Sequence, residues 1–142
     1  MKATSHRVVV TGMGIVLPFG QDVEMVFECL CQGRNGTNII NNYEKINLRR
    51  KNAVQIAYKI TCPQKWSTYS KATQISLTAV NSALDQSKLN IYDPTINVGV
   101  SFGTALGAIP EIQKEYIDSG LECNKMNVSL LKEFCYDTIS EM

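Results

Sequence analysis

The sequence predicts an α/β fold, in which helices cover a sheet of parallel strands. Two runs rich in β-branched residues, 8–10 and 96–102, each lead into a glycine turn, as buried strands of a parallel sheet do. Two helical patterns, near residues 23–31 and 70–89, lie between them. The order strand, helix, excursion, helix, strand, helix favours right-handed crossovers. Two strands make a thin sheet, so we expect part of a larger arrangement.

The first strand and the first helix follow directly from local patterns. The valines at 8–10 are consecutive and β-branched, and Gly12 and Gly14 end the run. Asp22 is placed to cap a helix that Gln32 and Gly33 would terminate. Its apolar residues recur at helical spacing: Val23, Val26, Phe27, Leu30 and Cys31.

The middle of the chain predicts an excursion followed by a second helix. Residues 34–65 are mostly polar and indicate loops, with one alternating stretch at 53–60 that suggests a short surface strand. Ser70 can cap the second helix, and its alanine-rich face implies close packing. That apolar stripe consists of Ala72, Ile75, Ala79, Val80, Ala83 and Leu84.

A third helix follows the second strand. Pro110 could open it, Glu111 falls in its first turn, and Gly120 is placed at the position just past its end. The remaining stretch carries a weaker helical stripe, formed by Leu130, Leu131, Phe134 and Ile139.

Composition excludes several classes of function. At 142 residues the chain has the size of one domain, and its formal net charge of +1 gives no field that favours nucleic acid or an anionic membrane. The three valines near the start are too few for a signal-peptide core or a membrane span. We therefore expect a cytoplasmic protein with no membrane span.

The cysteines and the single histidine predict neither a disulfide framework nor a metal site. The five cysteines are odd in number and irregularly spaced, which favours reduced thiols. Cys29 and Cys31 would point in different directions on a helix, and His6 lies in the first residues. No metal and no cofactor is expected.

The glycine pair could belong to a phosphate-binding turn, but the rest of that motif is missing. A dinucleotide-binding turn needs a third glycine where Leu17 stands, and Pro18 follows it. No G-K-[ST] sequence is present, and no tyrosine is followed four residues later by a lysine. A tight strand exit is the simpler interpretation, with a dinucleotide-binding domain as an alternative.

Four segments together resemble a known family. The sequence "VVVTGMG" followed by "LPFG" is similar to the opening of the β-ketoacyl-acyl-carrier-protein synthases, the condensing enzymes of fatty-acid and polyketide synthesis. "VFECLCQGRNGTNII" resembles their helix and G-R-S-G-I turn, with Asn35 in place of the serine and Thr37 in place of the isoleucine. "SLTAVNSALDQSKLN" and "INVGVSFGTALGAI" resemble the next helix and strand, in the same order, over residues 7–109.

The resemblance implies a thiolase-like layered α-β-α fold, incomplete and belonging to the N-terminal half of such a protein. Residues 1–142 would form a partial N-terminal β-ketoacyl synthase domain, with no second domain. The opening strand would be central, and its glycines would belong to the scaffold.

The resemblance also implies a function, the N-terminal portion of a 3-oxoacyl-[acyl-carrier-protein] synthase. The family loads an acyl chain on a cysteine and decarboxylates a malonyl thioester, whose carbanion attacks that acyl group. The nucleophilic cysteine and the two histidines of the family match no residue here, so we expect no catalytic residue and no activity from this chain alone. Its partners would be an acyl carrier protein and a ketosynthase subunit, in a homodimer or a heterodimer.

Three positions carry over as binding residues. Leu106, in "GTALGA", matches a family position that lines the acyl pocket, although an ordinary core leucine is the other interpretation. Phe134 and Tyr136 fall near a segment that reaches toward the acyl pocket of the dimer partner. The alternative function is a non-catalytic partner subunit similar to the chain-length factors, which shape the acyl tunnel of an active ketosynthase.

The incomplete sheet has a physical consequence. With few strands present, sheet edges stay unpaired, and the apolar helix faces at 23–31 and 72–84 stay partly uncovered. The sequence therefore predicts aggregation or obligate association.

Overall fold

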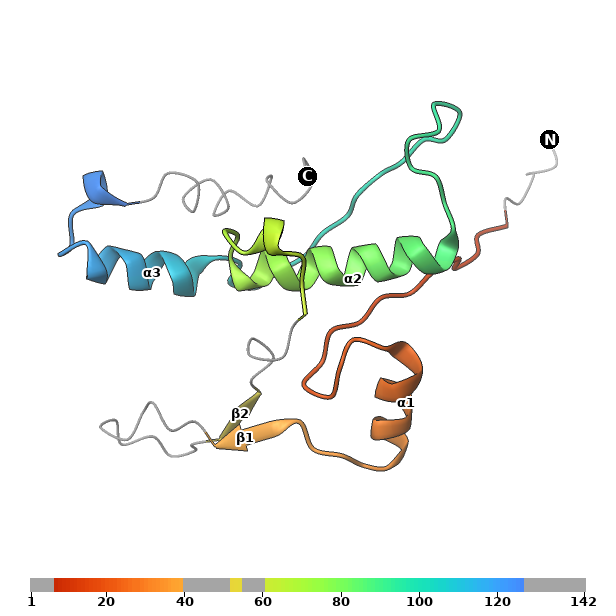
Figure 1. Ribbon diagram of the computed structural model, residues 1–142, viewed down its shortest axis with the longest axis horizontal. Helices are drawn as coiled ribbons and strands as arrows, with labels where there is room; N and C mark the ends of the chain where they lie inside the picture. The colour runs from red at the N-terminus through yellow and green to blue at the C-terminus, as the bar shows by residue number, and fades with distance from the viewer. Residues whose placement is uncertain (1–6, 40–51, 55–60, 127–142) are drawn as a thin grey trace, which may run out of the picture.

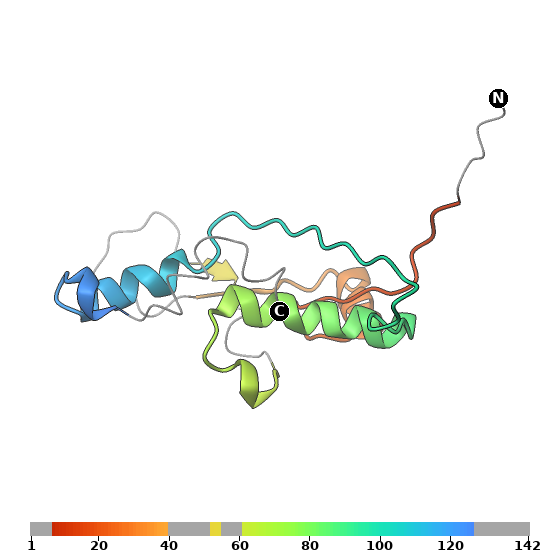
Figure 2. The ribbon, with the colours of Figure 1, turned by 90° about the horizontal axis from the view of Figure 1, so that it is seen from above.

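The computed structural model describes residues 7–39, 52–54 and 61–126. Helices α2 (Lys71–Ser87) and α3 (Ile109–Asp118) follow each other along the long axis of the molecule (Figures 1 and 2). Helix α1 (Val23–Cys31) and the antiparallel pair of β1 (Thr37–Ile39) and β2 (Asn52–Val54) lie below α2 in Figure 1. Two short 3-10 turns, η2 (Gln64–Trp66) and η3 (Cys123–Lys125), complete the described elements.

The predicted helix termini are confirmed. An Asp22 Oδ1 accepts the backbone N–H of Met25 at 2.8 Å, and Ser70 Oγ accepts that of Thr73 at 3.3 Å. Helices α1 and α3 both end in a Schellman motif, with Gly33 at φ +66° and Gly120 at φ +75° in the left-handed region. The side-chain caps and the two glycines therefore set where these helices begin and end.

The two predicted buried strands are not formed by the described residues. Residues 7–16 and 97–104 are extended, but neither segment is paired as a strand, and Val8 and Val10 are 92% and 81% exposed. A buried strand needs a neighbour to bond its backbone and layers that cover both faces. The described residues supply no paired strand, and they cover the first segment only where Gly12 and Gly14 meet α2. A layered α-β-α arrangement is accordingly not seen in this part of the chain.

The excursion at 34–65 holds more structure than the expected loops. Thr37 pairs with Val54 and Ile39 with Asn52 in an antiparallel register, so the suggested strand at 53–60 begins at β2 and has a partner in β1. Asn35 forms a turn just before β1. Its Oδ1 accepts the backbone N–H of Thr37 at 3.0 Å and the hydroxyl of Thr37 at 2.9 Å. Residues 55–60 lie outside the described part.

The segment that contains Gly12 and Gly14 packs directly on the backbone of α2. A Cβ on Gly12 would overlap the carbonyl oxygen of Ala83 and lie 3.1 Å from Ser87 Cβ. A Cβ on Gly14 would overlap the carbonyl oxygen of Ala79. The predicted close packing of the alanine face of α2 is thus confirmed, and the segment runs antiparallel to the helix.

A polar cluster is buried on another part of α2. Gln74 is 5% exposed; its Nε2 donates to the carbonyl of Tyr69 at 2.7 Å, and its Oε1 accepts from Cys62 Sγ at 3.4 Å. Thr78, also buried, donates to the carbonyl of Gln74 at 2.7 Å. Because these groups are bonded, their burial carries no large desolvation penalty, and the cluster ties residues 62–69 to the helix.

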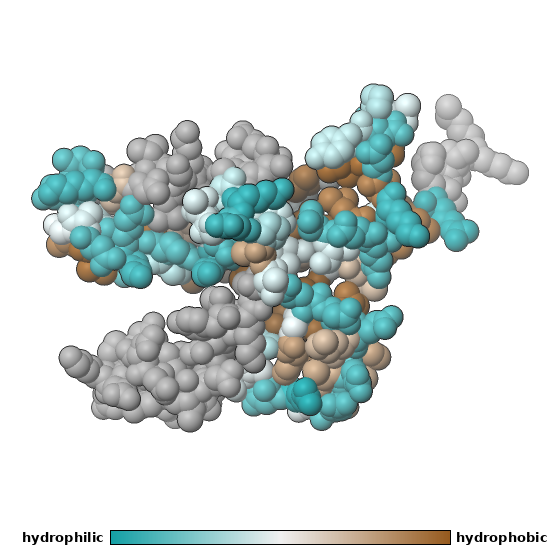
Figure 3. Space-filling model, in the orientation of Figure 1, coloured by the Kyte–Doolittle hydropathy of each residue, from teal (hydrophilic) through white to brown (hydrophobic). Residues whose placement is uncertain are grey.

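The predicted exposure of apolar surface is confirmed. The buried apolar residues of the described part are only Val16, Val26, Cys29 and Ala108. On the two helices named by the prediction, Phe27 and Leu30 of α1 are 67% and 53% exposed, and Val80 of α2 is 49% exposed. Figure 3 shows apolar surface gathered beside α2 and the N-terminal segment.

Replacing Gly12 or Gly14 with alanine is expected to lower the free energy of unfolding by about 1–3 kcal/mol, because the new methyl group would meet helix backbone that cannot move away. Urea unfolding followed by circular dichroism measures this change. Gly103→Ala is the matched control, since a Cβ there meets nothing within 4 Å. Equal stability of the Gly12 and Gly103 variants would contradict the packing described.

Candidate functional site

The glycine segment does not form a phosphate site. Its glycines face α2, and the backbone N–H of Met13 is already bonded to Gln86 Oε1 at 2.6 Å. A phosphate site would also use the N-terminus of the following helix, but α1 begins after Asp22, whose carboxylate occupies that end. This geometry supports the scaffold interpretation and argues against dinucleotide binding.

A tight turn separates this segment from α1. The backbones of Leu17 and Gly20 exchange two hydrogen bonds, of 2.9 and 3.0 Å, around Pro18 and Phe19. Gly36 lies against this turn, and a Cβ on Gly36 would be 3.0 Å from Pro18 Cγ. The turn therefore brings the start of β1 against the region before α1, and it places Pro18 where a phosphate-binding turn would require open backbone.

Leu106 lies in the turn that leads into α3. Its carbonyl accepts the backbone N–H of Ile109 at 3.0 Å, while the adjacent Gly107, at φ +51°, donates its N–H to Thr104 Oγ1 at 3.1 Å. The side chain of Leu106 is 58% exposed, whereas Ala108 is buried. Leu106 is thus not an ordinary core leucine in this structure, and its place in an acyl pocket stays a prediction.

The other two predicted pocket residues, Phe134 and Tyr136, lie outside the described residues, as does the helical stripe that contains Phe134. The structure therefore does not bring the three positions together.

The structure describes the side chains of three cysteines, Cys29, Cys31 and Cys62, and all three are free thiols. Cys29 is buried on α1, with Arg34 Nη1 3.6 Å from its sulfur. Cys31 is exposed at the end of α1, and Cys62 donates to Gln74. None of the three lies in the first turn of an α-helix, where the helix dipole would favour a thiolate. Across the described ranges, no three His, Cys, Asp or Glu side chains gather to hold a metal ion.

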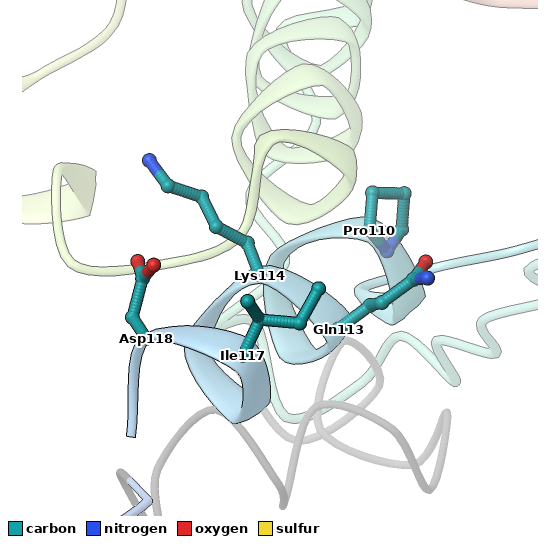
Figure 4. A pocket seen from close by; sticks show the side chains of 5 residues that line it. All are labelled: Pro110, Gln113, Lys114, Ile117 and Asp118. Atoms are coloured by element: carbon teal, nitrogen blue, oxygen red, sulfur yellow. The ribbon is translucent and has the colours of Figure 1, made fainter. Parts of the chain in front are cut away.

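A shallow hollow of about 300 Å³ lies on α3 (Figure 4). It is lined by one face of that helix: Pro110, Gln113, Lys114, Ile117 and Asp118. The lining offers one ammonium group and one carboxylate beside exposed apolar carbon. These groups do not include a nucleophile paired with a base, as nucleophilic catalysis requires.

The junction of α2 and α3 contains an interaction that sequence reasoning missed. Glu111 Oε1 accepts the backbone N–H of Lys71 at 2.9 Å, so the first turn of α3 caps the start of α2 from across the fold. From the sequence, the position of Glu111 in the first turn of its helix indicated only a favourable interaction with the dipole of that same helix. No sequence signal shows that the two helix N-termini meet, because 40 residues separate the partners.

An Asx turn shapes the connection from α2 to the extended segment 97–104. Asp93 accepts the hydroxyl and the backbone N–H of Thr95, at 2.7 and 2.9 Å, and these two bonds lower the pKa of its carboxyl group. A lowered pKa means that the bonds favour the ionised form. Their contribution is present above the ordinary aspartate pKa and is lost as the pH falls through the lowered value.

No helix in the described part of the chain is long and apolar enough to cross a bilayer.

Comparison with known proteins identifies the class. Residues 5–131 match the family model described as "Beta-ketoacyl synthase, N-terminal domain". The chain therefore belongs to the β-ketoacyl synthase family, as the four sequence segments predicted.

Individual relatives agree with this family. The chain is 32% identical over 118 residues to the tetracenomycin polyketide synthase ketoacyl synthase alpha subunit of Streptomyces glaucescens, covering 78% of this chain and 27% of the relative. It is 25% identical over 119 residues to 3-oxoacyl-[acyl-carrier-protein] synthase 2 of Coxiella burnetii, covering 78% of this chain and 28% of the relative. The chain thus spans less than a third of the length of these relatives.

Solved structures show the same fold. A β-ketoacyl synthase from Burkholderia phymatum superposes with a TM-score of 0.63 at 22% identity, covering 80% of this chain and 30% of the other. The ishigamide ketosynthase/chain length factor superposes with a TM-score of 0.62 at 21% identity, covering 89% and 33%. The described part is therefore folded like the corresponding part of ketosynthases, even though its own residues form no layered sheet.

Glu111→Ala is expected to lower the free energy of unfolding by about 0.5–2 kcal/mol, because the N–H of Lys71 loses its acceptor. Glu111→Gln keeps an acceptor oxygen and is the matched control. Urea unfolding of both variants measures the difference. If the glutamine variant is destabilised as much as the alanine variant, the charge and not the hydrogen bond is what matters.

Proposed function

We propose that this chain is the N-terminal part of a 3-oxoacyl-[acyl-carrier-protein] synthase, which supplies scaffold and a portion of the acyl pocket but not the nucleophile. The observation that carries the proposal is the match of residues 5–131 to the β-ketoacyl synthase N-terminal domain. Relatives named for both fatty-acid-type and polyketide synthases support the reaction class, a decarboxylative Claisen condensation.

The proposed reaction requires groups that this chain does not provide in its described part. A cysteine thiolate takes the acyl group from a carrier-protein thioester. A malonyl thioester then loses CO₂, and its carbanion attacks the acyl carbonyl and expels the cysteine sulfur, which leaves a 3-oxoacyl thioester. Histidines and backbone N–H donors hold the developing oxyanion. We assign these roles to the part of a synthase that the chain does not match.

The proposed contribution of this chain is to hold its own segments, and Leu106 among them, in place. The glycine contacts fix the segment at 12–14 on α2, and Glu111 fixes the start of α2 on α3, which begins at Ile109, three residues after Leu106. Leu106 is held at a turn with its side chain accessible, as a pocket wall requires. An acyl carrier protein and a ketosynthase subunit are the proposed partners, in the cytoplasm.

A second candidate is a non-catalytic partner subunit that adjusts acyl chain length. The likeness over 89% of this chain to the ishigamide ketosynthase/chain length factor is compatible with this candidate, as is the accessible side chain of Leu106. In this case the chain would bind an intact, active ketosynthase and alter the length of its products without adding a catalytic group.

Two reconstitutions separate the candidates. In the first, the full chain is produced together with the part of the S. glaucescens alpha subunit that it does not match, and 3-oxoacyl thioester formation is measured. In the second, it is mixed with the intact alpha subunit, and mass is measured by light scattering. Condensation in the first mixture alone supports the synthase part, while a discrete complex with altered product length in the second supports the partner subunit. If condensation is absent from the first mixture and no complex forms in the second, both candidates are refuted.

In whichever mixture is active, Leu106→Trp is expected to shift products toward shorter acyl chains, because the larger side chain would fill pocket volume. The ratio of the longest product to the next shorter product should fall about tenfold or more. One methylene too many in a hydrophobic pocket has an effect of this size. Leu89→Trp is the control, since Leu89 is exposed just after α2. An unchanged distribution for Leu106→Trp would remove Leu106 from the pocket.

A further inference from the structure

Asn35 and Gly36 form the one Asn-Gly pair in this sequence. They lie between α1 and β1, and the side chain of Asn35 is exposed to water. Asparagine is a chemically labile residue, because its side-chain carbonyl carbon can be attacked by the backbone nitrogen of the next residue. Glycine has no Cβ, so residue 36 leaves that approach open.

The side-chain carbonyl of Asn35 has two hydrogen-bond donors. Its Oδ1 accepts the backbone N–H of Thr37 at 3.0 Å and the hydroxyl of Thr37 at 2.9 Å. Attack on the Cγ of Asn35 would place negative charge on this same oxygen. Two donors that already contact an oxygen where charge develops stabilise the transition state, as in an oxyanion hole. The turn before β1 therefore activates the carbonyl group that it holds.

The attacking atom would be the backbone nitrogen of Gly36. Among the described residues, no backbone carbonyl accepts its N–H, so this proton can pass to water. The turn at 17–20 packs closely on the same residue, because a Cβ on Gly36 would be 3.0 Å from Pro18 Cγ and 3.3 Å from Phe19 Cζ. This contact limits the motion of Gly36 beside Asn35.

Asn90 provides a comparison within the same chain. It is exposed and forms the same kind of turn, since its Oδ1 accepts the backbone N–H of Tyr92 at 3.1 Å. The next residue, however, is the β-branched Ile91, and in the described part of the chain no hydroxyl donates to the Oδ1 of Asn90. Asn90 therefore has the turn without the glycine and without the second donor.

We propose that Asn35 and Gly36 are a self-modification site, at which the folded chain converts its own asparagine. The nitrogen of Gly36 gives its proton to water and bonds to Cγ of Asn35, while the bond from Cγ to Nδ2 breaks and ammonia leaves. One water molecule then opens the five-membered succinimide ring. Cleavage between the ring nitrogen and Cγ gives aspartate. Cleavage between the ring nitrogen and the main-chain carbonyl carbon gives isoaspartate.

The two products differ in their effect on the fold. Aspartate keeps an acceptor oxygen for Thr37 and should keep the turn. Isoaspartate adds a carbon atom to the main chain just before Gly36, where the contact with Pro18 is already tight. We therefore expect isoaspartate to displace the start of β1 and to break the pair between Thr37 and Val54.

Incubation of the full chain at neutral pH, followed by ion exchange and peptide mass spectrometry, tests the site. Both products carry one more negative charge, which takes the formal net charge from +1 to 0 and allows their separation. The peptide that contains Asn35 should show the replacement of NH₂ by OH, and the peptide that contains Asn90 should not. Digestion in heavy-oxygen water labels any conversion that occurs during digestion.

Asn35→Gln is the matched control, because its longer side chain does not close a five-membered ring and the acidic form should not accumulate. Absence of conversion at Asn35 in the folded chain, or equal conversion at Asn90, would overturn the proposal.

Thr37→Val tests the activation by the turn. Valine keeps the backbone N–H and the β-branch but removes the hydroxyl donor, so conversion of Asn35 in the folded chain should slow by about threefold or more. In concentrated urea the turn is lost, and the original chain and the variant should convert at the same rate. Equal rates in the folded state, or a difference that persists in urea, would refute the role of the turn.

Discussion

The arrangement of the chain depends on the contact between two glycines and the backbone of one helix. Gly12 and Gly14 lie where any side chain would overlap the carbonyl oxygens of Ala83 and Ala79. The alanines remove bulk from the helix and the glycines remove it from the extended segment, so two backbones approach without intervening side chains. Met13 contributes its N–H to Gln86 across the same contact. This contact joins the beginning of the chain to its middle.

Hydrogen bonds connect α2 to the other segments that surround it. At its N-terminal end, Glu111 of α3 and Ser70 satisfy the exposed backbone N–H groups. On its buried face, Gln74 holds the preceding residues through Tyr69 and Cys62. Because little apolar side-chain volume is buried in the described part, hydrogen bonds at the helix carry a larger share of the organisation than in an ordinary domain of this size.

Sequence reasoning succeeded where the determinants are local and failed where they are not. Asp22, Ser70, Gly33 and Gly120 act within a few residues of the helix ends they define, and the structure confirms each of them. The valines at 8–10 have the composition of a buried strand, but burial depends on neighbours that the described residues do not contain. The link from Glu111 to Lys71 was not predictable from either helix alone. The pairing of β1 was missed because residues 34–65 are mainly polar.

The repeat lengths of the two backbones determine which residues of the segment can face the helix. Two residues of extended chain advance about 6.6 Å, and four residues of α-helix about 6.0 Å. Successive contacts therefore slip by about half an ångström each time, and an extended segment stays in step with a helix for only a few repeats. Gly12 and Gly14 use positions that are in step, and the valines before them lie at and beyond the end of the helix, because Gly12 already faces Ala83 and Ser87 and α2 ends at Ser87. Position 13 alternates to the other side, so this geometry constrains residue size at 12 and 14 and leaves the side chain at 13 free to vary.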